Sequence, residues 1–367
     1  MIFGARIRQA REMALMTQAE LARETQIAQA HLSRAERDSY DLGHDRLAIV
    51  AAYLEFPLDF FTTAPIAEFG GRPVHFRAQA AMRMKQADQA TRTGEVVVEA
   101  VIRMEQHLEG PCLQLPDPQT DPLAAAAAVR RTLSLRPADP AIGLPILLEH
   151  AGVTVLGLPL RAQRRDAFSL WVDDRPVLAL LDTDAGDRQL WSTAHELGHL
   201  LLHRNIPASK DIEASADEFA MHLLLPIDAL VREMPASPTM SDFAMLKRRW
   251  GVSIAALIRM ARRLERITQE QYTSLFKQMS ARGERLRERT FIPAIKPRGL
   301  RAMAELTYGP SPAPGLAADN NWSVLFAEQV LDRHARVEDL PVRTSMPSVR
   351  PNNVVAINVA RKSGRRK

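Results

Sequence analysis

Two histidines and a glutamate in the middle of the chain have the residue types and spacing that support metal chemistry. His195 and His199 are four residues apart, and Glu196 lies between them in a segment with the apolar spacing of a helix. One helical turn places both imidazoles on one face, where each can reach a zinc ion at about 2.0–2.1 Å. Glu196 can approach the ion's water without ligating the ion. The spacing therefore predicts a zinc site with its own general base.

A third ligand has to come from another part of the chain. His203 continues the same helix face, but eight residues of helix separate it from His195 by about 12 Å. Glu213 is the better candidate, because it lies near the start of a second helix predicted over 212–225. Two His and one Glu leave the fourth tetrahedral position open for water, as in a catalytic site. Asp217, one turn after Glu213, could accept the second ring N–H of a ligating histidine.

A small mixed α+β domain over residues 131–232 is expected to position these side chains. A helix is predicted over 142–148. Three short β-type runs precede the histidine helix, at 153–156, 167–172 and 177–181. The single cysteine, Cys112, lies in a proline-rich loop, which excludes an internal disulfide and thiolate zinc sites. Any metal must therefore take His and carboxylate ligands.

Four segments of this region carry a family resemblance: 166–169 (Asp-Ala-Phe-Ser), 175–177 (Arg-Pro-Val), 191–203 with its His-Glu-Leu-Gly-His core, and 213–226. In these segments the chain resembles the ImmA/IrrE family of zinc metallo-endopeptidases. The resemblance implies Zn²⁺ on His195, His199 and Glu213, with Glu196 as catalytic base in the hydrolysis of a peptide bond. Where this chain has Asp217, the family commonly has Asn.

The first 64 residues predict an all-α domain. Apolar residues over 3–15 have helical spacing, and Thr17-Gln-Ala-Glu20 is typical of a capping box that begins a second helix. Further short helices are predicted over 29–37 and 45–56.

This N-terminal segment resembles the Cro/repressor-type helix-turn-helix family over about 60 residues. The resemblance implies DNA binding, with the helix at 29–37 in the major groove and Gln18 on a phosphate. The groove-facing side chains are then Gln29, Ala30, His31, Ser33 and Arg34. Gln26 occupies a turn position where the family usually has Gly, which adopts a positive φ more easily.

Three further regions complete the predicted organisation. Residues 65–130 form a helical linker, in which one long helix over 79–108 is expected to be interrupted at Gly94. Residues 233–300 form a helical appendage that resembles a second helix-turn-helix, and residues 301–367 form a C-terminal region with a basic tail. The fold class is thus multidomain: an all-α helix-turn-helix domain, an α+β zincin-like domain and a helical appendage.

Charge and composition indicate the partners. The 367-residue chain has a net charge of +5 and a pI near 9.6, which favours a nucleic-acid partner. Residues 1–65 nevertheless total −2, whereas 259–301 total +8, either as a phosphate-binding face or as a solvated helix surface. No apolar stretch has the roughly 18 residues of a membrane span, so we expect a cytoplasmic protein without a membrane partner.

The sequence therefore predicts a DNA-binding, zinc-dependent endopeptidase that cleaves a partner transcriptional repressor or antitoxin-like protein and so relieves repression. DNA would bind through residues 1–64, and the chain could form a homodimer. Two alternatives stay open. One is a transcriptional regulator whose protease-like domain senses a ligand or metal without cleaving protein, and the other is an interaction module of a toxin–antitoxin pair. The oxyanion-stabilising group also stays open among His203, His222 and Tyr272.

Overall fold

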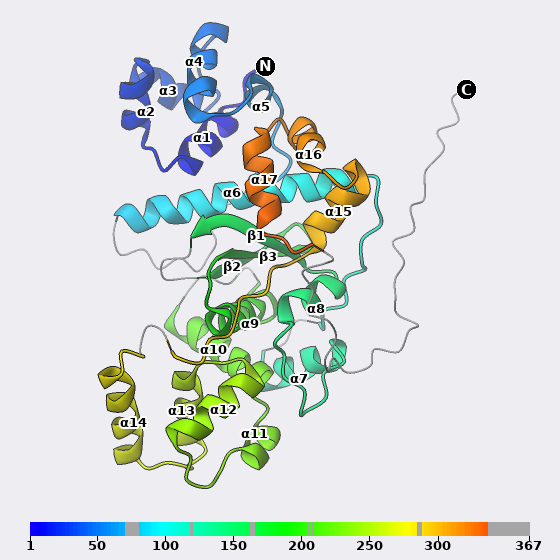
Figure 1. Ribbon diagram of the computed structural model, residues 1–367. Coiled ribbons are helices and arrows are strands. Elements are labelled where there is room, and N and C mark those ends of the chain that lie inside the picture. Colours follow the sequence, from blue (N-terminus) through cyan, green and yellow to red (C-terminus); the bar gives the residue numbers. More distant parts are fainter. Residues whose placement is uncertain are drawn as a thin grey trace, which may run out of the picture.

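The structure is a computed structural model with four successive layers (Figure 1). It describes residues 1–69, 81–117, 120–161, 166–204, 206, 209–284 and 288–336, with only the backbone at 81–83. An N-terminal group of short helices lies above one long helix, a three-stranded sheet follows, and further helices cover the far face of the sheet. The basic tail predicted at the C-terminal end lies outside the described residues.

The N-terminal layer contains the helices predicted there. They are α1 (Gly4–Met13), α2 (Gln18–Thr25), α3 (Gln29–Ala35), α4 (His44–Leu54) and α5 (Leu58–Thr62). The Thr17 hydroxyl accepts a hydrogen bond from the Glu20 backbone N–H, and the Glu20 carboxylate accepts one from the Thr17 N–H. This capping box begins α2 as predicted. Apolar side chains close a compact core between the five helices, including Ile7, Leu21, Leu32, Val50 and Phe61.

The long helix, α6 (Ala81–Glu105), runs without a break through Gly94, so the predicted interruption there is wrong. The reason is tertiary. A Cβ at Gly94 would lie 2.8 Å from a ring carbon of Phe69 and 3.2 Å from one of Phe168. The missing side chain lets both rings pack against the helix backbone, and this packing outweighs the weak helix propensity of glycine.

The sheet consists of β1 (Thr154–Arg161), β2 (Ala167–Val172) and β3 (Arg175–Asp182), in the order β1-β3-β2. β1 runs parallel to β3, and β2 runs antiparallel to it. Successive residues of β3 alternate between the two faces, because side chains in a strand have a period of two. Val177 and Ala179 join the hydrophobic cluster that contains α6, whereas Leu178 and Leu180 join the cluster on the opposite face.

Helices cover both faces of the sheet. On the face away from α6 they are α7 (Pro122–Thr132), α8 (Leu144–His150), α9 (Gly186–Leu202), α10 (Lys210–Leu224), α11 (Ile227–Glu233), α12 (Met240–Trp250), α13 (Ile254–Arg263) and α14 (Gln269–Ala281). On the α6 face the chain returns as α15 (Gly299–Tyr308), α16 (Ala313–Asn320) and α17 (Val324–Asp332) (Figure 1). The three β-type runs and the helices predicted around the histidines are therefore confirmed.

Polar contacts help to attach the returning C-terminal helices. The Gly157 backbone N–H donates to Nε2 of the buried His334 at 3.0 Å, and the Glu149 carboxylate accepts from the backbone N–H groups of Arg298 and Gly299. The predicted fold class is confirmed as helix-turn-helix, then α+β, then helices. Among the described residues, no helix combines the length and the apolar character needed to cross a membrane.

Candidate metal centre and DNA-binding face

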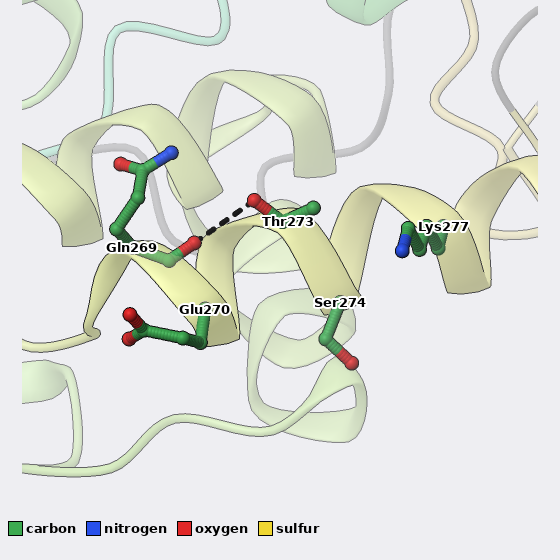
Figure 2. Close-up of a pocket in the computed structure, with 5 residues that line it drawn as sticks. All are labelled: Gln269, Glu270, Thr273, Ser274 and Lys277. Carbon is green, nitrogen blue, oxygen red and sulfur yellow. Dashed lines mark hydrogen bonds between the residues drawn. The ribbon is translucent and has the colours of Figure 1, made fainter.

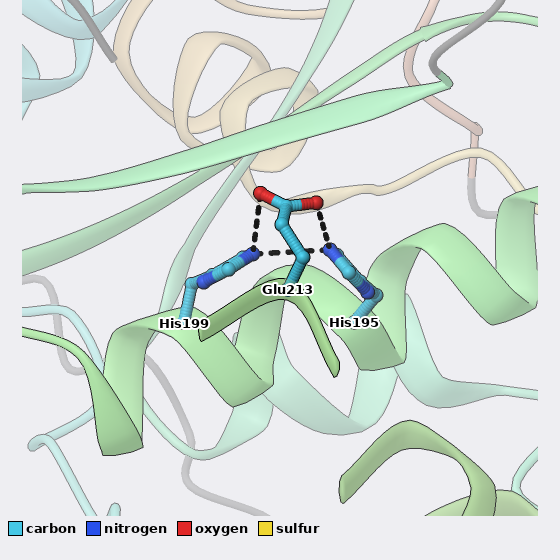
Figure 3. A group of neighbouring side chains, drawn as sticks. All are labelled: His195, His199 and Glu213. Atoms are coloured by element: carbon cyan, nitrogen blue, oxygen red, sulfur yellow. Dashed lines mark hydrogen bonds and ion pairs between the residues drawn. The ribbon is translucent and has the colours of Figure 1, made fainter. Parts of the chain in front are cut away.

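The centre is built where α10 packs against α9, which itself lies on the sheet. Gly198 makes this close approach possible, because a Cβ there would lie 3.0 Å from the Phe219 ring and 3.3 Å from the Ala216 Cα. The contact places the first turn of α10, which holds Glu213, over the two histidines of α9 (Figure 3).

The structure brings the three predicted ligands together. Nε2 of His195 and Nε2 of His199 are 3.0 Å apart, and they lie 3.7 and 3.8 Å from the nearer Glu213 carboxylate oxygens. All three ligand atoms lie within 4.8 Å of one another. Ligands at zinc distances on a tetrahedron are separated by about 3.3–3.5 Å. The spacing and the donor set therefore fit a Zn²⁺ ion with a fourth position to spare.

Asp217 orients the first histidine. Nδ1 of His195 lies 2.9 Å from Oδ1 of Asp217, so that an Nδ1–H donor leaves the Nε2 lone pair on the side of Glu213. Burial alone lowers the pKa of His195, but the hydrogen bond to Asp217 and the charges of Glu196, Asp217 and Glu213 outweigh it and raise the pKa. A proton and a metal ion would therefore compete for this side chain.

His203 orients His199, the second predicted ligand. Nδ1 of His199 lies 3.0 Å from Nδ1 of His203, and Nε2 of His203 lies 2.7 Å from Oγ of Ser215. His203 therefore sits behind His199, on the Nδ1 side of the ring. This position does not suit it to stabilise an oxyanion beside the Nε2 atoms.

Glu196 is held from the sheet side. Its carboxylate is almost fully buried, and the Ser169 hydroxyl lies 2.8 Å from its Oε2 and 2.9 Å from its main-chain oxygen. Ser169 belongs to β2, so the sheet and not only the helix fixes the candidate base. No role is predicted for Ser169 from the sequence. Two signals pointed to it: Ser169 belongs to one of the segments that carry the family resemblance, and it is a polar residue in an otherwise apolar strand.

The two remaining oxyanion candidates make contacts of another kind. His222 faces Glu218 at 3.6 Å, and burial together with the nearby Arg263 charge lowers its pKa. The ring of Tyr272 packs against Phe276, with centroids 4.8 Å apart. These contacts explain both residues as parts of the helical packing.

The DNA-binding side chains predicted on α3 are organised around Tyr40. The His31 ring stacks on Tyr40 at 4.6 Å, and the Arg34 guanidinium lies 4.8 Å above the same ring. The Ser33 hydroxyl accepts a hydrogen bond from Arg37. Gln29 and Ala30, at the first turn of α3, are exposed.

Two glutamines before α3, Gln26 in the turn and Gln18 at the predicted phosphate contact, have defined conformations. Gln26 adopts the left-handed conformation, with φ 56°, that favours glycine in this turn. Gln18, predicted to contact a phosphate, donates instead to the Glu36 carboxylate at 2.7 Å, so it would have to exchange that partner when DNA binds.

A separate hollow lies along one face of α14 (Figure 2). Its lining is Gln269, Glu270, Thr273, Ser274 and Lys277. All five residues are exposed and come from a single helix. A shallow surface of this kind lacks the convergent buried polar groups of a ligand site, and we assign no chemistry to it.

Comparison with known families agrees with this architecture. Residues 148–262 match the model of the IrrE N-terminal-like domain, a peptidase family, and residues 7–61 match that of the helix-turn-helix. No curated protein matches the chain. The two resemblances inferred from sequence are thereby confirmed. The chain combines a helix-turn-helix DNA-binding domain with a metallopeptidase-type domain.

Proposed function

We propose that this DNA-binding regulator with a protease-like domain is a zinc-dependent endopeptidase that cleaves a partner repressor or antitoxin-like protein. The observation that carries the proposal is the convergence of His195, His199 and Glu213 within 4.8 Å. Buried Glu196 comes from the same turn of α9 as His195. This donor set and its general base suit hydrolysis of a peptide bond.

Zn²⁺ held by the three ligands would supply a Lewis acid and lower the pKa of a water molecule. The protein's own residues do the rest. Glu196 would accept the proton of the attacking water on a carboxylate oxygen and return it to the leaving amine. Ser169, 2.8 Å from Oε2, would keep that carboxylate in one orientation, and Asp217 would hold the His195 ring.

The DNA-binding domain supports a substrate that is itself found at operators. Residues 1–65 have a net charge of −2, which weakens sequence-independent attraction to phosphates. Recognition would therefore depend on the base-edge contacts of α3, and a homodimer would read two half-sites. A peptidase placed at an operator in this way would meet a repressor bound nearby at high local concentration.

The test combines metal analysis with cleavage. We expect about one zinc per purified chain, lost in His195→Ala, and a discrete cut in a repressor encoded near the gene for this chain. Glu196→Gln should keep the zinc and abolish the cut, because it removes only the base. A cut that persists in Glu196→Gln, or a wild-type protein without stoichiometric zinc, would overturn the proposed enzymatic function. Operator binding without any cleavage would instead favour the metal- or ligand-sensing regulator.

A further inference from the structure

The end of α9 carries a hydrogen-bonded relay that leads away from the metal centre. His203 is the residue directly after α9, and it is buried. Its Nδ1 lies 3.0 Å from Nδ1 of His199, and its Nε2 lies 2.7 Å from the Ser215 hydroxyl. The Ser215 hydroxyl in turn donates to the backbone oxygen of Ile212, at 3.1 Å, in the first turn of α10.

Only one arrangement of protons satisfies every link when His199 is a ligand. A neutral imidazole has one N–H and one lone pair, and a ligating Nε2 must present its lone pair. His199 then donates from Nδ1, so that His203 must accept at Nδ1 and donate from Nε2. Ser215 accepts that bond and donates its own proton to Ile212. The ligating tautomer of His199 is thus the one that the relay selects.

We propose that His203 and Ser215 are positioning residues for the metal centre, acting through His199. This inference rests on the proposed zinc site. The relay joins the end of α9 to Ile212 in the first turn of α10, and Ser215 lies two residues from Glu213. A single set of bonds therefore fixes the ring of one ligand and the helix turn that carries another. Partners of this kind orient ligating histidines and contribute to metal affinity.

The experiment measures Zn²⁺ affinity of the full chain by competition with a chelator. His203→Leu removes both hydrogen bonds, and we expect zinc binding about 10- to 100-fold weaker. His203→Asn keeps an acceptor near the position of Nδ1, and its affinity should fall between those of the Leu variant and the wild type. Ser215→Ala, which removes only the far end of the relay, should weaken binding roughly two- to tenfold.

His222→Leu is the matched control, because His222 is an equally buried histidine on α10 that faces Glu218. Its zinc affinity should equal that of the wild type. Unfolding of each metal-free variant reports loss of stability separately, and Ser215→Ala tests the relay should His203→Leu not fold. Wild-type zinc affinity in folded His203→Leu, or in Ser215→Ala, would overturn the inference while leaving the zinc site in place. A wild-type chain that binds no zinc would overturn the proposed function and the inference with it.

Discussion

Two pairs of helices, α2–α3 and α12–α13, are each joined by the same kind of turn, and we call them the first and the second unit. Each begins with a capping box, from Thr17 before α2 and from Thr239 before α12. Each turn then has a left-handed residue, a buried aliphatic residue and an N-cap residue in that order. These are Gln26, Ile27 and Ala28 before α3, and Gly251, Val252 and Ser253 before α13. The local backbone pattern is therefore the same in both units.

Burial of the second helix separates the two units. In α3 only Leu32 and Ala35 are buried, so most of its surface remains available to DNA. In α13 half of the ten residues are buried, namely Ile254, Leu257, Ile258, Met260 and Ala261. Arg263, near the end of α13, pairs with Glu218 of α10 at 2.9 Å. The same turn can therefore present a largely exposed or a half-buried second helix, and only exposed side chains can contact base edges.

The two units are attached to the protein through different buried ion pairs. Arg6 of α1 donates to Glu99 of α6 at 2.6 Å, and both side chains are buried. Lys247 of α12, also buried, donates to Asp187 of α9 at 2.7 Å. Apolar side chains surround both contacts, so each attachment combines ionic and hydrophobic interactions.

The largest expected effect breaks the ion pair of the first unit. Arg6→Ala leaves the buried Glu99 carboxylate dependent on the longer ion pair with Arg103, at 3.7 Å, which should cost about 3–5 kcal/mol of unfolding free energy. Urea denaturation of the full chain measures this loss. The double variant Arg6→Met with Glu99→Leu should recover most of it, because it removes both charges of the buried pair. A loss below about 1 kcal/mol in Arg6→Ala would show that the contact resembles an ordinary surface ion pair.

A second prediction compares two arginines at the same place in the two units. Arg34 and Arg259 are each the sixth residue of their helix, α3 and α13, and both are exposed. With a duplex selected by the wild-type protein from random DNA, Arg34→Ala should weaken binding by about 1–3 kcal/mol, roughly 5- to 150-fold. Arg259→Ala should leave it unchanged. Equal losses in fluorescence anisotropy titrations would mean that both units contact DNA.

Substitutions of the left-handed turn residues should change the stability less, and the local packing decides whether the protein is stabilised or destabilised. Gly251 has φ +74°, and a Cβ there would lie 3.0 Å from side-chain carbons of both Ile142 and Leu190. Gly251→Ala should therefore destabilise the protein by roughly 1–2 kcal/mol, as measured by thermal unfolding. An unchanged midpoint would mean that this turn is not packed as the structure has it.

The smallest effect is expected at the equivalent turn of the first unit. Gln26 already takes the left-handed conformation at φ 56°, at some cost for a residue with a Cβ. Gln26→Gly relieves that cost, although it also increases the freedom of the unfolded chain, and we expect a net gain of about 0.5 kcal/mol. A clear loss of stability would point to the hydrogen bond from the Gln26 side chain to the Arg23 oxygen as the dominant contribution.

Much of the centre could be predicted because it depends on local geometry. The helical period alone places His195 and His199 on one face, and capping residues mark where helices begin. Glu213 required a further step, the packing of two helices, which the amphipathic pattern of 212–225 indicated. Sequence periodicity constrains these features directly.

The parts that sequence missed depend on contacts between distant segments. Ser169 reaches Glu196 across 27 residues, from a strand to a helix, and no spacing rule connects the two. Gly94 was expected to interrupt a helix because glycine is a poor helix former, and only the rings of Phe69 and Phe168 explain its place inside α6. A single sequence does not encode such partners in its local pattern.

The close packing at Gly94 of α6 has a mechanical consequence. α6 is about 37 Å long. Arg6 and Gln9 bind it on one side, and Phe168 packs against it on the other. The residue after Phe168 is Ser169, which holds Glu196. A rotation of α6 driven from the helix-turn-helix domain would press on the Phe168 ring and so on the strand that carries Ser169. A chain of packed side chains therefore connects the DNA-binding domain with the candidate catalytic base.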